Sequence, residues 1–325
     1  MKHKFSILNF QFSILLLLLL FVSCEKVIEI DDDPSAAKLV LNGLPVPDQR
    51  AFVYFAHTRF FLDPSNDQPV PGAQLTLSVN GIPYAPDSVS RCKYFFPYTL
   101  AEGDSLSIDV TTPRGTVHGR TYIPYTPHLT DISIRNHSGA ALRYYQTHFT
   151  LHDRPDLTEY YNLTVSVRDS GLRRNHWRRV YDTLTGTWHP SIDTVDTVRN
   201  TYFLLPSNPE IQGDNSFILP MAGRIYTRNI FIDSAINGQV YPVTLNIINL
   251  RDTNEIPPFK HEYTVKLQSL TPARLRYLID VSRQGSGNNF FAEQGQVRSN
   301  LEGALGVFAG SATNQFSFDP DTLPR

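Results

Sequence analysis

A short run in the first third of the chain decides the fold class: Leu75-Thr76-Leu77-Ser78-Val79-Asn80-Gly81. Leucine and valine alternate here with threonine and serine, which is the period-two pattern of a strand with one buried face. Asn80 and Gly81 follow at once, and both residue types tolerate a positive φ, so the pair favours a tight turn. The run therefore predicts a β-hairpin.

The same alternation recurs on both sides of this hairpin. Leu106, Ile108 and Val110 alternate before a turn at residues 112–115, and residues 116–123 return. Alternation also covers residues 145–151 and 161–167, and further strands are predicted at residues 129–134, 201–205, 225–232, 243–250 and 262–270, with a weaker final strand at 305–309. Short strands separated by turns at this spacing are typical of β-sandwiches.

One helix is predicted among these strands. Thr271 can cap its N-terminus, and Pro272 suits the first helical position. The next large apolar residues fall on one helical face: Leu275, Leu278 and Ile279. We expect this helix to end near residue 283, before a glycine-rich loop.

Two prolines, Pro124 and Pro127, indicate a stiff linker because each fixes its own φ. The predicted fold class is therefore mainly β. An N-terminal Ig-like or transthyretin-like β-sandwich is expected at residues 34–126. A larger β-rich domain with one short helix is expected at residues 127–325.

The N-terminal residues are predicted to be a targeting signal and not part of the folded domain. Lys2 and Lys4 precede an apolar run at residues 12–22, which has the length of a signal-peptide core and is too short to span a bilayer. The run ends at Phe21-Val22-Ser23-Cys24, which resembles a bacterial lipobox. We therefore predict a lipoprotein signal peptide at residues 1–23 and a tether at residues 24–33.

Cys24 is the predicted lipidation site. Its thiol would carry a diacylglycerol, and several acyl chains anchor a protein stably where one chain is marginal. The alternative is an ordinary signal peptide in which Cys24 is incidental. This covalent lipid is the one prosthetic group that we expect.

Cysteine and charge counts exclude several classes of protein. Cys92 is the one cysteine besides Cys24 in 325 residues, so no disulfide framework is possible and Cys92 is expected to be free. The formal net charge is −2 and the sequence pI is about 6.5. A general nucleic-acid binder would show a basic excess instead.

Four stretches carry a resemblance to a known family: 24–30; 39–43 with 70–77; 160–163 with 231–234 and 237–238; and 299–310. Together they resemble the lipoprotein family catalogued as domain of unknown function 4249, found in the Bacteroidota. The family usually has glycine where this chain has Ala304. The resemblance implies a lipoprotein of the outer membrane, often encoded beside a TonB-dependent receptor. It implies no reaction and no catalytic residues.

The sequence contains no HExxH, GxSxG, GxxxxGK[ST] or GxGxxG motif. His148 and His152 are four residues apart, but the pattern around them is that of a strand and its turn. Asp153 and Asp156 flank Pro155, and turn chemistry explains both. We therefore predict no catalytic residue, no metal ligand and no enzymatic activity.

One segment is a candidate partner-docking site, because Trp and Arg are frequent interface hot spots. Its residues are Arg173, Arg174, Trp177, Arg178, Arg179 and Trp188. The alternative is a solvated hairpin whose tryptophan covers a sheet edge. The small-residue tail at residues 303–310 is expected to be a tightly packed closing strand.

The expected function is that of a non-enzymatic binding or accessory lipoprotein, lipid-anchored in the outer membrane beside a TonB-dependent receptor of nutrient uptake. Two alternatives stay open at this point: a cell-surface hydrolase acting on peptide or glycan, and a purely structural surface protein. The sequence leaves open the ligand, the oligomeric state and the face of the membrane.

Overall fold

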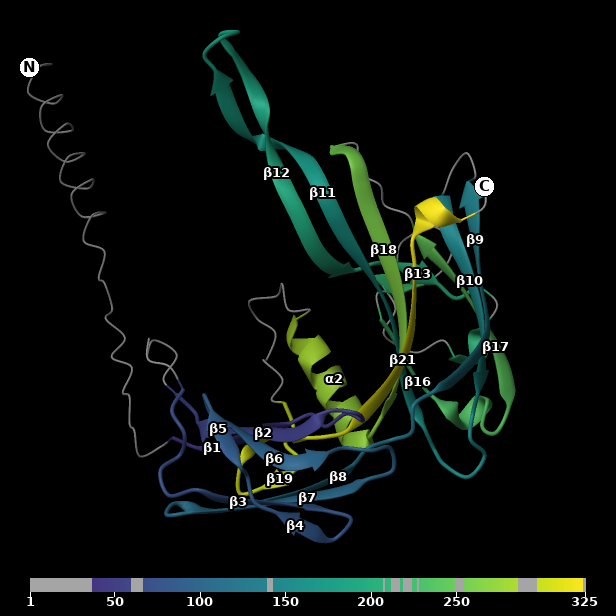
Figure 1. Ribbon diagram of the computed structural model, residues 1–325. Coiled ribbons are helices and arrows are strands. Elements are labelled where there is room, and N and C mark those ends of the chain that lie inside the picture. The colour runs from purple at the N-terminus through teal and green to yellow at the C-terminus, as the bar shows by residue number, and fades with distance from the viewer. Residues whose placement is uncertain are drawn as a thin grey trace, which may run out of the picture. The chain divides into compact units, whose positions relative to one another are not determined.

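The computed structural model describes residues 37–59, 67–138, 143–206, 208–211, 217–218, 224–226, 228–248, 254–285 and 297–323. The predicted signal peptide, the tether and Cys24 lie outside these residues. From Lys38 onward, the described residues other than Arg59 belong to one compact unit. They are mainly β, as predicted, with one α-helix among them, α2 (Pro272–Gly285) (Figure 1).

Two sheets form the first sandwich. One contains β1 (Leu39–Gly43), β2 (Arg50–His57), β5 (Ser88–Ser90), β6 (Lys93–Thr99) and β20 (Leu305–Phe308), in the order β20-β1-β2-β6-β5. The other contains β3 (Gln74–Val79), β4 (Ile82–Tyr84), β7 (Ser105–Thr112), β8 (Gly115–Tyr122) and β19 (Leu301–Glu302), in the order β19-β8-β7-β3-β4. Alternate residues of both sheets meet in one core that contains Leu41, Phe55, Leu77, Phe96 and Ile108.

The predicted hairpin is present as β3 and β4. Asn80 and Gly81 connect the two strands with φ values of 52° and 83°. Leu75, Leu77 and Val79 are buried, whereas Thr76 is exposed. The period-two pattern therefore identified the buried face, and Asn80-Gly81 identified the turn.

The second sandwich has a more uneven pair of sheets. One contains β9 (His128–Ser138), β10 (Arg143–His152), β13 (Phe203–Leu204), β14 (Phe217–Ile218), β15 (Arg224–Tyr226) and β17 (Val240–Ile248), in the order β14-β15-β13-β17-β10-β9. The other contains β11 (Tyr160–Asp182), β12 (Thr187–Asn200), β18 (Glu255–Leu270) and β21 (Ser311–Phe318), in the order β12-β11-β18-β21, and β16 (Arg228–Ile232) also pairs with β11. Their core includes Phe149, Tyr161, Leu163, Phe203 and Leu245.

The C-terminal tail returns to the first sandwich. Strand β20 pairs in parallel with β1, and β19 pairs with β8. Phe308 is buried in the first core. A Cβ atom on Gly306 would lie 2.0 Å from the carbonyl oxygen of Leu41, and one on Gly310 would lie 2.0 Å from that of Tyr122. The tail is therefore the tightly packed segment that its small residues predicted.

This pairing corrects one predicted boundary. Residues 301–308 were assigned to the domain at 127–325, but their hydrogen bonds place them in the sheets of the first sandwich. Strand β21 was not predicted, because its residues 311–318 are mostly polar and small. It pairs with β18 and buries Phe318 in the second core.

The helix forms where it was predicted. Thr271 Oγ1 accepts a hydrogen bond from Arg274 N (3.3 Å) and donates one to the carbonyl oxygen of Gly310 (3.1 Å). Thr271 thus caps α2 and fastens it to the tail. Within the described ranges, no helix has the length and apolar character needed to cross a bilayer.

Candidate functional site

Strands β11 and β12 continue beyond the sheet to which they belong. Strand β18 pairs with β11 only as far as Arg173 and Glu255. From there the hairpin goes on as two strands, with Arg173 opposite Asp193 and Asp182 opposite Thr187 (Figure 1). We call residues 173–193 the arm.

Apolar side chains of the arm face solvent. Trp177 is 100% exposed and Leu184 is 95% exposed. Trp188 is also exposed, and its ring lies 5.2 Å from that of Tyr181. Trp177 therefore covers no sheet edge, and that part of the alternative interpretation of this segment is wrong.

The arginines of the arm fall into two groups. The guanidinium of Arg173 lies over the ring of Phe259, 5.4 Å from its centroid, so Arg173 packs at the root of the arm. Arg174, Arg178 and Arg179 are exposed and form no ion pair with any described residue. Three free guanidinium groups thus accompany the exposed Trp177.

Local hydrogen bonds hold the arm in this conformation. Asn175 Oδ1 accepts from the backbone N of Trp177 (3.0 Å) and of Arg178 (3.2 Å), and Asn175 Nδ2 donates to Asp193 Oδ2 (2.8 Å). These bonds stabilise the bulge between Asn175 and Arg179. At the tip, the backbone N of Leu184 donates to Asp182, which lowers the pKa of that carboxyl.

A buried ionic cluster lies at the root of the arm. Asp169 is almost fully buried and accepts from Arg199 Nε (2.9 Å) on one oxygen, while its other oxygen lies 2.8 Å from His261 Nδ1. His261 Nε2 lies 3.2 Å from Glu255 Oε2. Because these residues come from β11, β12 and β18, the cluster ties the arm to the sheet.

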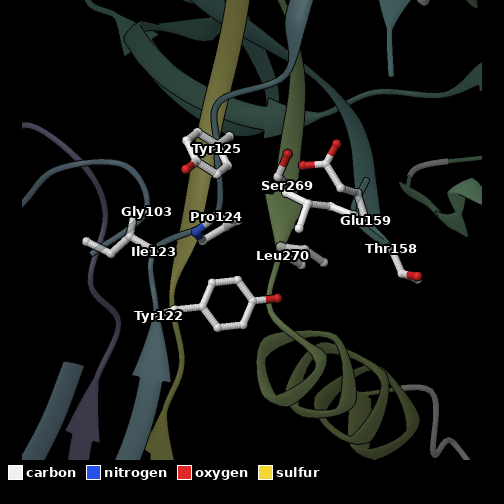
Figure 2. A pocket seen from close by; sticks show the side chains of 10 residues that line it. Gly103, Tyr122, Ile123, Pro124, Tyr125, Thr158, Glu159, Ser269 and Leu270 are labelled. Carbon is white, nitrogen blue, oxygen red and sulfur yellow. The ribbon is translucent and has the colours of Figure 1, made fainter. Parts of the chain in front are cut away.

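A separate cavity of about 220 Å³ lies where the two sandwiches meet. Its walls come from four segments: the loop before β7, the end of β8 with the linker after it, the segment before β11 and the end of β18. The lining residues are Gly103, Tyr122, Ile123, Pro124, Tyr125, Leu157, Thr158, Glu159, Ser269 and Leu270 (Figure 2). Most of these side chains are apolar. The guanidinium of Arg154 lies 3.9 Å from the centroid of the Tyr125 ring.

Three buried carboxyl groups gather behind this cavity. The Tyr161 hydroxyl lies 2.8 Å from Asp153 Oδ1 and 2.7 Å from Glu159 Oε2. A hydroxyl has one proton to donate, so both contacts are hydrogen bonds only when one carboxyl group is protonated and donates back. The third group, Asp233, accepts from the backbone N of Glu159 (2.5 Å).

The surroundings favour such protonation. Burial raises the pKa of Asp153, and the Tyr161 and Gly238 hydrogen bonds offset part of that rise. Burial likewise raises the pKa of Glu159. The hydrogen bond from Tyr161 and the charge of Arg154 offset part of that rise, while the charges of Asp153 and Asp233 add to it. Burial beside these acids also raises the pKa of Tyr161.

Only one of the three carboxyl groups reaches the cavity. Glu159 lines it, together with Ser269, and Figure 2 draws both side chains on the same side of the pocket. Ser269 is 1% exposed, and its Oγ has no hydrogen-bond partner among the residues that the structure describes. The cavity thus combines mainly apolar walls with a few polar groups, Glu159 and Ser269 among them.

Comparisons with known proteins settle the family. The model of the domain of unknown function DUF4249 matches residues 25–317. The chain belongs to the DUF4249 family. A search of the curated proteins finds no match.

A solved structure similar to this DUF4249 chain is that of a DUF4785 family protein from Legionella pneumophila subsp. pneumophila str. Philadelphia 1. The match covers 71% of this chain and 52% of that one, at 10% identity and a TM-score of 0.24. The chain therefore spans about half the length of this structure, and the TM-score is too low to indicate a shared fold.

The stretches that carried the family resemblance converge on the acid cluster of this DUF4249 chain. Residues 160–163 contain Tyr161, residues 231–234 contain Asp233, and the backbone N of Gly238 donates to Asp153 Oδ2 (2.8 Å). Sequence analysis did not predict the cavity. The one local signal was an acidic residue, Glu159, directly before an alternating strand.

The other candidates from the sequence have ordinary roles. His148 Nδ1 lies 2.8 Å from Thr244 Oγ1, and His152 Nε2 lies 2.8 Å from Thr130 Oγ1. No group of three or more potential metal ligands occurs among the described residues. Asp156 is exposed, 3.7 Å from Arg154, whereas Asp153 is buried against Tyr161. Turn chemistry therefore accounts for Asp156 but not for Asp153.

Proposed function

We propose that this DUF4249 chain is a lipid-anchored, non-enzymatic accessory protein of the outer membrane. In this proposal the arm docks on an acidic surface of a TonB-dependent receptor. The observation that carries the proposal is the fully exposed Trp177 beside three arginines that form no ion pair with any described residue. No other surface in the described part of the chain combines an exposed tryptophan with such a cluster.

The physical chemistry of the arm supports a protein partner. Arg174, Arg178 and Arg179 repel one another, and salt screens that repulsion only in part at short range. Carboxylates on a partner would remove the repulsion and add charge-assisted hydrogen bonds. Trp177 and Leu184 would bury apolar area, and an interface tryptophan contributes about 2 kcal/mol or more when it is a hot spot.

The cavity supports binding over hydrolysis. A glycoside hydrolase needs two carboxyl groups that face the substrate from opposite sides. Among the residues that line the cavity, Glu159 is the single acid, while Asp153 and Asp233 lie behind it. We therefore prefer the accessory role to the hydrolase alternative.

The docking proposal is tested by co-purification from native membranes. A variant with Trp177→Ala and with Arg174, Arg178 and Arg179 replaced by Ser should lose most of the receptor that the unaltered chain retains. Raised salt should weaken retention by the unaltered chain, because it screens the arginines. Receptor identity is read by mass spectrometry.

A matched control changes comparable exposed residues away from the arm. The variant Ile82→Ala, Arg114→Ser, Arg276→Ser removes an exposed aliphatic group and two exposed arginines. It should retain the receptor. If the arm variant and the control retain the receptor equally at low and high salt, the arm is a solvated hairpin and the docking proposal is wrong.

The anchor is tested separately. A Cys24→Ala protein should lose its acyl mass and leave the membrane fraction, because no other membrane anchor is proposed. A Cys92→Ala protein serves as the control, since it removes the other cysteine of the chain, which is buried in the first sandwich. A Cys24→Ala protein that stays in the outer membrane would contradict the lipid anchor.

A further inference from the structure

We propose that the cavity between the two sandwiches binds a small organic amine, with its apolar body against Tyr122, Leu157 and Leu270 and its ammonium group against Glu159 and Ser269. This inference goes beyond the docking role and does not depend on it. The arm consists of residues 173–193, and none of these residues lines the cavity.

The walls of the cavity determine the body of the ligand. Ile123, Pro124, Leu157 and Leu270 present aliphatic groups, and Tyr122 adds an aromatic ring (Figure 2). Ligand pockets in general have such apolar linings with a few placed polar groups. A volume of about 220 Å³ lies below the roughly 300–1,000 Å³ of pockets for drug-sized molecules, so the ligand is small.

The hydroxyl of Ser269 indicates that a polar group belongs in the cavity. Buried polar atoms are almost always hydrogen-bonded, because an unpaired one loses its hydration without compensation. Ser269 is 1% exposed, yet its Oγ has no hydrogen-bond partner among the described residues. Strand pairing fixes its position, since Ser269 lies opposite Tyr161 on β11 and Ala312 on β21. A ligand that enters the cavity can supply the missing partner.

The charges around Glu159 determine the sign of that polar group. The titratable and charged groups that face Glu159 are Asp153, Arg154, Tyr161, Asp233 and Tyr122. Together with Glu159 itself, the cluster contains three carboxyl groups, and Arg154 is its one cation. Arg154 is also engaged with the Tyr125 ring and lies 3.7 Å from Asp156. A ligand cation would offset the excess negative charge, whereas a ligand anion would add to it.

The hydrogen bonds of Glu159 leave room for the ammonium group. Tyr161 contacts Oε2 of Glu159, and the carboxyl lines the cavity. An ammonium group has three donors and no acceptor, so it can serve both the Glu159 carboxylate and the Ser269 oxygen. A neutral alcohol could serve Ser269 but would leave the charge of the cluster unchanged.

The first experiment compares three probes that share one body. Isothermal titration calorimetry with the full-length chain in detergent would use phenethylamine, 2-phenylethanol and 3-phenylpropionate. We expect the amine to bind about tenfold or more tightly than the alcohol, as a charged hydrogen bond contributes more than a neutral one. The carboxylate should bind least. Equal affinity for the amine and the alcohol, or preference for the carboxylate, overturns the proposal, and so does absence of binding by all three.

The second experiment changes Glu159 and Ser269, the two residues proposed to hold the ammonium group. Glu159→Gln keeps the size of the side chain and should weaken amine binding about tenfold or more, with little effect on the alcohol. Ser269→Ala should weaken both probes by a few fold. Asp156→Asn is the matched control, because Asp156 carries the same charge near the cavity but does not line it. A control that loses as much affinity as Glu159→Gln would mean that general surface charge holds the amine, which overturns the site.

The pH dependence of binding provides a third readout. Amine binding requires the ionised form of Glu159, so amine affinity should rise with pH as this carboxyl loses its proton. The rise should be weaker in Glu159→Gln and absent for 2-phenylethanol. The two proteins differ at residue 159 alone, so the difference between their pH profiles isolates Glu159. A pH dependence that is identical in both proteins contradicts the assignment of Glu159.

Discussion

The two ends of strand β11 share the same backbone conformation but differ in burial and in charge. At one end, Tyr161, Leu163, Val165 and Val167 are buried, and their neighbours on the other face are more exposed. Along residues 173–182 no residue is buried, on either face. Both ends form a ladder with β12 or β16, so local hydrogen bonding does not explain the difference.

A second sheet explains it. The buried end contributes to a core shared with β10 and β17 of the opposite sheet, whereas the arm has lost even the neighbouring strand β18. Because a strand buries a face only against another layer, alternation persists where that layer exists and disappears in the arm. The exposure of Trp177 and Leu184 in a two-stranded ribbon therefore supports the proposed docking of the arm.

The two ends also differ in charge. Beside Tyr161, the carboxyl groups of Asp153, Glu159 and Asp233 form one cluster, from which Glu159 lines the cavity. The arm instead carries Arg174, Arg178 and Arg179. A formal net charge of −2 for the whole chain therefore conceals an acidic concave site and a basic projecting one.

The sharpest test of this comparison is to truncate one leucine at the buried end of β11 and one leucine in the turn at the tip of the arm. Leu163→Ala should lower the free energy of unfolding by about 2–5 kcal/mol, because it leaves a cavity in a fully buried position. Leu184→Ala should change it by less than about 0.5 kcal/mol, since that side chain is 95% exposed. Urea unfolding followed by circular dichroism measures both. Similar losses for the two variants would mean that the arm packs against something within the chain.

The root of the arm provides an intermediate case. Asp169→Asn should lower the free energy of unfolding by about 1–3 kcal/mol, because it weakens buried hydrogen bonds with Arg199 and His261. Asp196→Asn is the control on the next strand: Asp196 pairs with Arg168 at the surface, where an ion pair contributes little. The same urea titrations apply. If the control loses as much stability as Asp169→Asn, the buried cluster does not fasten the arm.

Much of this architecture could be predicted from the sequence. The alternation at residues 75–79, 145–151 and 161–167 identified strands and their buried faces. Successive side chains of a strand point to opposite faces, so apolar residues at every second position mark the face that contacts the core. Asn80-Gly81 identified a turn, and Thr271 with Pro272 identified the start of a helix. These signals are local, and the structure that they specify is local too.

The features that the sequence did not predict depend on contacts between distant residues. Val307 N donates to the side chain of Asn42, 265 residues away, and no local pattern specifies that pairing. The cavity takes its walls from four separate segments. The sequence left both a covered and a free position open for Trp177, because its exposure depends on where β18 ends.

The acid cluster at the buried end predicts an unusual pH dependence. Burial raises the pKa of Asp153 and Glu159 above their ordinary values of 3.8 and 4.5. The folded state therefore binds these protons more tightly than the unfolded state does. Their contribution to stability is fully present below the ordinary values and is lost as the pH rises through the raised folded-state values.

Unfolding measured at several pH values checks this sign. The free energy of unfolding of the parent protein, relative to that of Glu159→Gln, should fall as the pH increases through this window. Glu102→Gln is a control, because Glu102 is an exposed carboxyl whose side chain accepts from Thr126 N. A parent protein whose stability relative to Glu159→Gln rises with pH would show that Glu159 is ionised and well paired in the folded state.

The smallest expected effect on the free energy of unfolding concerns Trp177 of the arm. Trp177→Ala should change the free energy of unfolding by less than about 0.5 kcal/mol, since a fully exposed side chain loses no contacts. The chain has two tryptophans, Trp177 and Trp188, and both lie in the arm. Tryptophan fluorescence of the isolated protein therefore reports on the arm alone. Its emission should be that of water-exposed indole and should change little on unfolding, while circular dichroism shows the full transition.

Trp188→Phe would leave Trp177 as the single reporter, whose emission should shift to the blue when a partner covers it. A blue-shifted emission of Trp177 in the isolated protein would mean that the arm is already covered, by a second copy or by another part of the chain, and the contrast between the two ends of β11 would then disappear.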